Sequence, residues 1–196
     1  MPEPGLPTPD PAPPTPASDG PQASGRDRLR PGTRDPHRSR ERALKVLFQA
    51  DLRGEDPRDA LARVLADPDA VALLDDVDVD DTDTDRLAAA RHRPDPLDEY
   101  AQQLIEGVGV HRDELDGLIE RFARRWTVAR MPVVDRNLLR LAAYELLHED
   151  TAPAVVIDEA LELAKDLSTD NSVRFVNGVL ESVRRWHEQR PADDAD

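Results

Sequence analysis

The sequence predicts an all-α protein of about seven helices, arranged in two blocks at residues 37–65 and 97–190. Three observations carry this prediction. Apolar residues recur every three or four positions through both blocks, proline stands near several of the stripe starts, and strand signals such as an Asn-Gly hairpin between alternating runs are scarce. A chain of 196 residues is long enough to bury a substantial core in one domain.

The first block, residues 37–65, predicts two helices. Asp56-Pro57 is a capping residue followed by proline, a pattern that starts helices, so a second helix begins there. Both helices carry a stripe that we expect to face the core: Ala43, Leu44, Leu47, Phe48 and Leu52 after Ser39, and then Leu61, Val64 and Leu65.

The second block, residues 97–190, predicts five helices. Gly107 and Gly109 are expected to end the first of them, and Gly178 inside the last stripe is expected to mark a close helix–helix contact. The stripes are Leu97, Tyr100, Ala101, Leu104, Ile105 and Val108; Leu115, Leu118, Ile119, Phe122 and Trp126; Val134, Leu138, Leu141 and Ala142; Val156, Ala160, Leu163, Ala164 and Leu167; and Val176, Leu180 and Val183, with Trp186 as a further candidate.

Three segments depart from the helical composition. Residues 1–36 hold 11 of the 18 prolines and no aromatic residue, so we expect a disordered arm. Residues 66–96 form an acidic insertion, also expected to be disordered, and 191–196 form an acidic tail. These acidic segments account for most of the net charge of −15, which leaves the helical blocks nearly balanced.

The sequence offers no set of residues for catalysis. With no cysteine, thiol nucleophiles and disulfides are excluded, and no register of the acidic run fits a calcium loop. The histidines form no i, i+4 pair, so we expect no metal site, no cofactor and no enzyme. No apolar run could span a membrane and no signal peptide is visible, which predicts a cytoplasmic protein without membrane contact. The histidines are His37, His92, His111, His148 and His187.

A cluster of arginines at the start of the first helix predicts a phosphate-bearing partner. Residues 26–42 carry seven arginines against three acidic residues. Guanidinium groups pair with phosphate oxygens two at a time, and cations at a helix N-terminus oppose its dipole, so helix stability does not explain them. The alternative is a merely solubilising helix start. The candidate contacts are Arg34, His37, Arg38, Arg40 and Arg42.

Three motifs resemble the NusB family of bacterial transcription antitermination factors. They are VDRNLLRLAAYELL (134–147), VVIDEALELAKDLSTDNSVRFVNGVLESV (155–183) and RSRERALKVLFQADL (38–52). The resemblance covers residues 37–65 and 97–186. It implies an all-helical fold of two small packed bundles. It also implies a non-catalytic protein that binds boxA RNA of ribosomal RNA transcripts with the ribosomal protein NusE and helps RNA polymerase resist termination.

The resemblance places family functions on particular residues. The family's arginine-rich motif falls on His37, Arg38, Arg40 and Arg42, although Pro36, Ser39 and Glu41 interrupt it here. A second RNA patch falls on Asn171, Arg174 and Phe175, where Phe175 either stacks on a base or packs in the core. The surface for NusE falls on the helices near residues 100–120, with Glu106, Asp113 and Asp116 as acidic candidates for a basic partner.

Two alternatives stay open at this point. One is a helical scaffold that forms homodimers and has no direct role with RNA. The other is an RNA-binding fragment related to ribosomal RNA cytosine methyltransferases, which require catalytic cysteines that this chain lacks.

Overall fold

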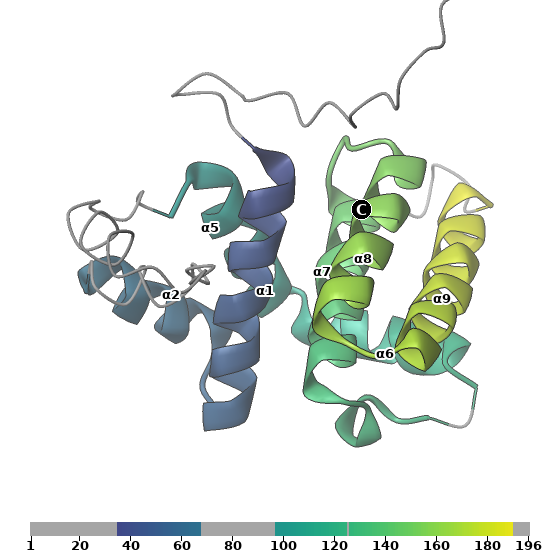
Figure 1. Ribbon diagram of the computed structural model, residues 1–196, viewed down its shortest axis with the longest axis horizontal. Helices are drawn as coiled ribbons and strands as arrows, with labels where there is room; N and C mark the ends of the chain where they lie inside the picture. The colour runs from purple at the N-terminus through teal and green to yellow at the C-terminus, as the bar shows by residue number, and fades with distance from the viewer. Residues whose placement is uncertain (1–34, 68–96, 125, 190–196) are drawn as a thin grey trace, which may run out of the picture. The chain divides into compact units, whose positions relative to one another are not determined.

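The computed structural model describes residues 35–67, 97–124 and 126–189 (Figure 1). Within these ranges the protein has seven α-helices, one short 3-10 helix and no strand, which confirms the predicted fold class. The expected disorder of the arm, the insertion and the tail, and the candidate contact Arg34, lie outside the described residues. The helices are α1 (Pro36–Arg53), α2 (Pro57–Ala66), α5 (Glu99–Val110), α6 (Arg112–Phe122), η1 (Val128–Arg130), α7 (Val133–His148), α8 (Pro153–Leu167) and α9 (Asp170–Glu188).

The helices form two groups that share one hydrophobic core. α1, α2 and α5 pack against one another, and α6 to α9 pack around α7. α1 and α5 also contact α7, so α7 joins the groups (Figure 1). Burial of leucine and isoleucine side chains on the facing stripes supplies the main driving force for this packing. The largest fully buried side chains include Leu44, Leu47, Leu104, Ile105, Leu115, Ile119, Leu138, Leu141 and Leu163.

Side-chain caps set the starts of α1 and α9, the two helices that carry the predicted RNA contacts. The Asp35 carboxylate accepts hydrogen bonds from the backbone N–H groups of His37 and Arg38, so α1 begins at Pro36, earlier than the predicted Ser39. Thr169 caps α9 through the backbone N–H of Ser172. Both caps fix where the following side chains leave the helix.

Three apolar residues predicted to face the core are exposed instead. Leu52 and Leu65 lie in the last turns of α1 and α2. Trp126 is 52% exposed, because α6 already ends at Phe122 and the stripe is broken there. Apolar spacing therefore predicted where the helices lie. It did not predict at which residue a neighbouring helix stops covering the apolar stripe.

The glycines have other roles than the sequence predicted for them. α5 continues through Gly107 and Gly109 to Val110. A Cβ atom on Gly107 would lie 2.0 Å from the ring of Tyr144, so this glycine allows the close approach of α5 and α7. Gly178, expected to mark such a contact, is exposed, and a Cβ atom there would meet nothing within 4 Å.

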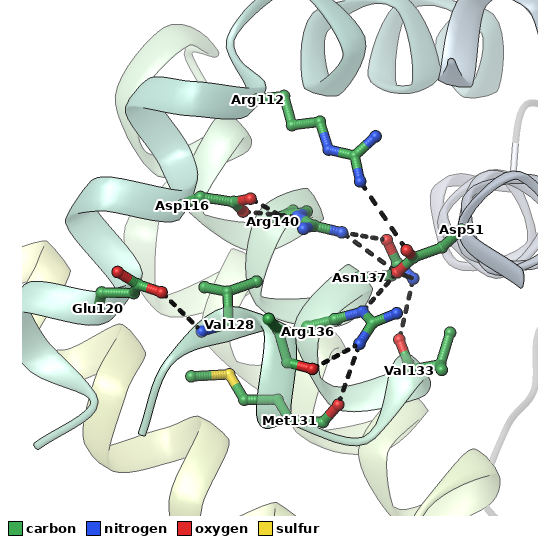
Figure 2. Close-up of polar contacts among 11 residues, drawn as sticks. Asp51, Arg112, Asp116, Glu120, Val128, Met131, Val133, Arg136, Asn137 and Arg140 are labelled. Carbon is green, nitrogen blue, oxygen red and sulfur yellow. Dashed lines mark hydrogen bonds and ion pairs between the residues drawn. The ribbon is translucent and has the colours of Figure 1, made fainter. Parts of the chain in front are cut away.

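A polar network joins α1, α6 and α7 beside the core (Figure 2). Asp51 accepts hydrogen bonds from Arg136 at 2.5 Å and Asn137 at 2.9 Å, while Arg140 donates to both carboxylate oxygens of Asp116 at 2.6 and 2.9 Å. Burial alone would raise the pKa of Asp51, but the hydrogen bonds from Arg136 and Asn137 lower it overall. The network therefore holds Asp51 ionised and fixes α1 against α7.

Candidate nucleic-acid interface

The start of α1 presents His37 and Arg38 to solvent. Arg38 is exposed, and His37 is partly exposed with its Nδ1 atom 2.8 Å from the Glu159 carboxylate of α8. Both residues lie in the turn that the Asp35 cap holds, where the Asp35 carboxylate occupies the backbone N–H groups of His37 and Arg38. Arg38 thus brings an exposed cation to this turn, next to the carboxylates of Asp35 and Glu159.

Arg40 and Arg42 do not reach the surface in the same way. Each is only 3% exposed. The Arg40 guanidinium makes a bidentate contact with Glu145, at 2.8 and 3.0 Å, and donates to the Tyr100 hydroxyl at 3.1 Å. Burial by itself lowers the pKa of Arg40, but Glu145 raises it overall, so the charge is retained. Both arginines are thus largely covered, and Arg40, which still lines the pocket beside this turn, holds α1 against α5 and α7.

An open pocket of about 380 Å³ lies beside the exposed turn of α1. His37 and Glu159 line one part of it, and Tyr100 and Thr151 line another. Tyr100 donates its hydroxyl hydrogen to Glu145, and burial together with this carboxylate raises the pKa of Tyr100. The pocket is also lined by Arg40, so it offers hydroxyl, imidazole and carboxylate groups beside one guanidinium, the kinds of group that bind the polar edges of a nucleotide.

The start of α9 forms the second patch. Asn171 and Arg174 are exposed, whereas Phe175 is half-buried. Phe175 packs against the core and also lines an open pocket of about 290 Å³, so it has the core contact that was predicted, and its stacking on a base stays a prediction. The buried Asp135 carboxylate fixes this end of the helix, because it accepts the Ser172 hydroxyl at 2.8 Å.

Trp126 belongs to this second patch, and the sequence did not predict it. It lines the same pocket as Phe175 and Asn171, together with Met131 and Pro132. An exposed indole beside a half-exposed phenyl ring is the arrangement on which unpaired bases stack. The only sequence signal was the tryptophan itself, because helical spacing assigned it to the core stripe of α6.

The two patches lie at different ends of α8 (Figure 1). His37 contacts Glu159 in the first half of α8, and α9 begins just after α8 ends. The stretch of α8 from Glu159 to Leu167 rises about 12 Å. Glu159 and Glu162 also lie close to His37 and would repel a phosphate backbone there. The patches are therefore two separate contact points rather than one continuous basic groove.

The acidic residues predicted for a protein partner fall into two classes. Glu106 on α5 and Asp113 on α6 are exposed. Asp116 is only partly exposed, and both of its carboxylate oxygens accept hydrogen bonds from Arg140 (Figure 2). Asp116 thus serves the network inside the protein, which leaves Glu106 and Asp113 as candidates. None of the described helices is both long and apolar enough to cross a membrane.

Comparison with known proteins gives a consistent family match. The model of the NusB family matches residues 37–185. The chain is 50% identical over 148 residues, or 75% of its length and 85% of the relative, to the transcription antitermination protein NusB of Acidothermus cellulolyticus. It is 44% identical over 146 residues, or 74% of its length and 82% of the relative, to the protein of the same name from Saccharopolyspora erythraea.

Solved structures agree with the sequence comparison. NusB of T. maritima is 33% identical and superposes with a TM-score of 0.59, covering 83% of this chain and 97% of that one. A chain in a crystal structure of antitermination factors NusB and NusE in complex with double-stranded RNA is 26% identical, with a TM-score of 0.56, over 76% of this chain and 96% of that one.

Proposed function

Since the chain belongs to the NusB family, we propose that it is a transcription antitermination factor that binds boxA-type RNA of ribosomal RNA transcripts together with the ribosomal protein NusE. The observation that carries this proposal is 50% identity, over three quarters of the chain, to a protein named for antitermination. The similar structure that contains NusB, NusE and RNA supports both partners.

The protein would act as a non-catalytic adaptor in the cytoplasm. It would help RNA polymerase resist termination by binding the transcript and NusE at the same time, without a cofactor. The features that support this role are two surface patches suited to RNA and a separate acidic surface, rather than an assembled nucleophile, base and orienting group.

RNA would contact the protein at the two separate patches. At the start of α1, Arg38 would pair with a phosphate, and His37 would lie beside the nucleotide. At the start of α9, Arg174 would pair with a second phosphate, and a base would enter the pocket between Trp126 and Phe175. Arg40 and Arg42, which are buried, would position the first patch, and Arg40 also lines its pocket.

NusE would bind near the corner between α5 and α6, where Glu106 and Asp113 are exposed. Two carboxylates on this surface favour a basic partner, and ribosomal proteins that bind RNA carry such charge. Substitution of Glu106 and Asp113 by glutamine and asparagine should slow association with NusE and leave binding of RNA alone unchanged.

The proposal is tested by titrating boxA RNA and a scrambled RNA of the same composition into the full chain, with and without NusE. We expect boxA to bind more tightly than the scrambled RNA and NusE to increase that preference. Equal binding of both RNAs in both conditions would contradict the proposal.

Two matched variants and one further measurement complete the test. Arg38→Ala should weaken RNA binding, whereas Arg53→Ala at the opposite end of the same helix should not. Gel filtration of the same samples examines the homodimer alternative. A dimer that persists in the presence of RNA and NusE, and binds neither, would favour a scaffold role instead.

A further inference from the structure

The structure brings two histidines together that are far apart in the sequence. His111 lies at the corner between α5 and α6, and His148 is the last residue of α7. Their rings are stacked with centroids 4.0 Å apart. Glu114, in the first turn of α6, points one carboxylate oxygen at both: Oε2 lies 3.0 Å from His111 Nδ1 and 3.6 Å from His148 Nε2.

Neighbouring residues hold the two rings in this position. The Tyr144 ring lies against both, with centroids 5.9 Å from His111 and 5.3 Å from His148. Tyr144 can occupy this place because Gly107 of α5 has no side chain to exclude it. The arrangement is therefore set by the packing of α5 against α7 and not by the three polar residues alone.

Local helix chemistry does not account for His111. The residue stands at the N-cap position of α6, where serine, threonine, aspartate and asparagine are preferred, and its side chain makes no capping hydrogen bond. Its ring is directed to Glu114 instead. The side chain thus serves the cluster rather than the helix.

The donor atoms have the chemistry and spacing of a metal site. Two imidazole nitrogens and one carboxylate oxygen are common zinc ligands, and bond lengths near 2.1 Å place neighbouring donors about 3.4 Å apart in a tetrahedron. The distances of 3.0 and 3.6 Å to the shared oxygen lie on either side of that value. All three donor atoms lie within 4.8 Å of one another, so only small side-chain movements would bring them around one ion.

We propose that His111, Glu114 and His148 bind one Zn²⁺ ion. The three side chains would supply three ligands, and a water molecule would complete the tetrahedron on the open side, because each of these side chains is a quarter to a half exposed. The ion would connect the α5–α6 corner to the end of α7, so that it would strengthen the junction of the two helix groups. This site is independent of the RNA patches.

The alternative is a purely structural ion pair and ring stack. A carboxylate between two imidazoles is also satisfied when one histidine is protonated, and such a cluster needs no metal. The two interpretations differ in a measurable way. If the cluster is a metal site, loss of either ring or of the carboxylate weakens Zn²⁺ binding, whereas a purely structural cluster binds no Zn²⁺ that depends on these side chains.

The experiment is a calorimetric titration of ZnCl₂ into the full chain, prepared without an affinity tag and first treated with a chelator. We expect one ion per chain at the strongest site. Loss of a residue that merely orients a ligand costs about 10- to 100-fold in affinity, so His111→Gln and His148→Gln should each weaken binding at least that much. Zn²⁺ should raise the melting temperature of the wild type and not of these variants.

Two further variants make the result decisive. His37→Gln is the matched control, because His37 lies beside Glu159 and Glu162 in the other cluster of this kind among the described residues, and it should bind Zn²⁺ like the wild type. Glu114→Gln keeps both rings and should weaken binding even if a histidine variant fails to fold. Undiminished affinity and stoichiometry in the folded variants of the site, no Zn²⁺ binding by the wild type, or loss only in His37→Gln would overturn the proposal.

Discussion

The starts of α1 and α9 both carry arginines predicted to bind RNA. At α1 two of these arginines are buried, whereas the arginine at the start of α9 is exposed. Arg38, Arg40 and Arg42 are spaced two residues apart, so Arg40 leaves α1 on the opposite side from the other two. Because α5 and α7 both pack on α1, only the first turn stays open, and Arg40 and Arg42 are buried. A basic run therefore predicts an interface, and helix packing decides which of its side chains reach the surface.

The start of α9 shows the opposite arrangement. Asn171, Arg174 and Phe175 follow the i, i+3, i+4 spacing that places side chains on one face of a helix. Asn171 and Arg174 are exposed, and Phe175 lines the pocket beside Trp126. Fewer charges are present than at α1, but Asn171 and Phe175 line one pocket and Arg174 is exposed on the same helix face. Variants at the two helix starts distinguish a role of buried charge from a role of exposed contacts.

The largest effect should come from Arg40→Ala. The substitution leaves the Glu145 carboxylate buried without its cationic partner, and breaking a buried ion pair in this way costs about 3–5 kcal/mol. Arg38→Ala, on the exposed turn of the same helix, should change the free energy of unfolding by less than about 0.5 kcal/mol. Urea unfolding of both variants measures the difference. Equal stability of the two variants would contradict the assignment of Arg40 as a structural residue.

A smaller loss of stability should follow from Asp135→Ala at the start of α9. Asp135 accepts the hydroxyl groups of Ser168 and Ser172 at 2.6 and 2.8 Å, and unsatisfied buried groups cost about 1–3 kcal/mol. Hydrogen exchange should increase at the first turn of α9 while the start of α1 is unchanged. Ser182→Ala, which removes a hydroxyl later in α9, is the control. Increased exchange at both helix starts would show that the patches are not anchored independently.

Trp126→Ala should affect RNA binding more than stability. Stacking of a base on an aromatic side chain contributes about 1–3 kcal/mol, so the free energy of binding to boxA RNA should become less favourable by that amount. The indole is half exposed, and its removal should hardly change the melting temperature. Leu52→Ala, at an exposed apolar residue in the last turn of α1, provides the comparison. If both variants bind RNA like the wild type, the pocket at α9 does not receive a base.

Much of the fold could be predicted from local sequence, because each helix carries its own apolar stripe. The exposed Leu52, Leu65 and Trp126 could not, since the end of a buried stripe depends on where a partner helix stops. The same limit applied to the glycines. Whether Gly107 or Gly178 lies at a close contact depends on which helix packs over it, and that information is absent from the local pattern.

The candidate interface likewise has a part that could be predicted from the sequence and a part that could not. The arginine cluster predicted the first patch and the resemblance to a family predicted the second, and the structure leaves Arg38, Asn171 and Arg174 exposed there. The burial of Arg40 was hidden, because its partner Glu145 lies 105 residues further along the chain. Pairings over such distances arise from tertiary packing, and a single sequence without an alignment carries no signal for them.

The smallest effect, and the most direct comparison of the two patches, should be in the salt dependence of RNA binding. Each phosphate contact on a single strand contributes about −0.7 to the slope of log affinity against log salt. Arg38→Ala and Arg174→Ala should each make the slope less negative by about that amount, and the double variant should show the sum because the patches are separate. Arg185→Ala, exposed near the end of α9, should leave the slope unchanged. A change with only one of the two variants would confine RNA to a single helix start, and a double variant no different from either single one would mean that the patches share one phosphate contact.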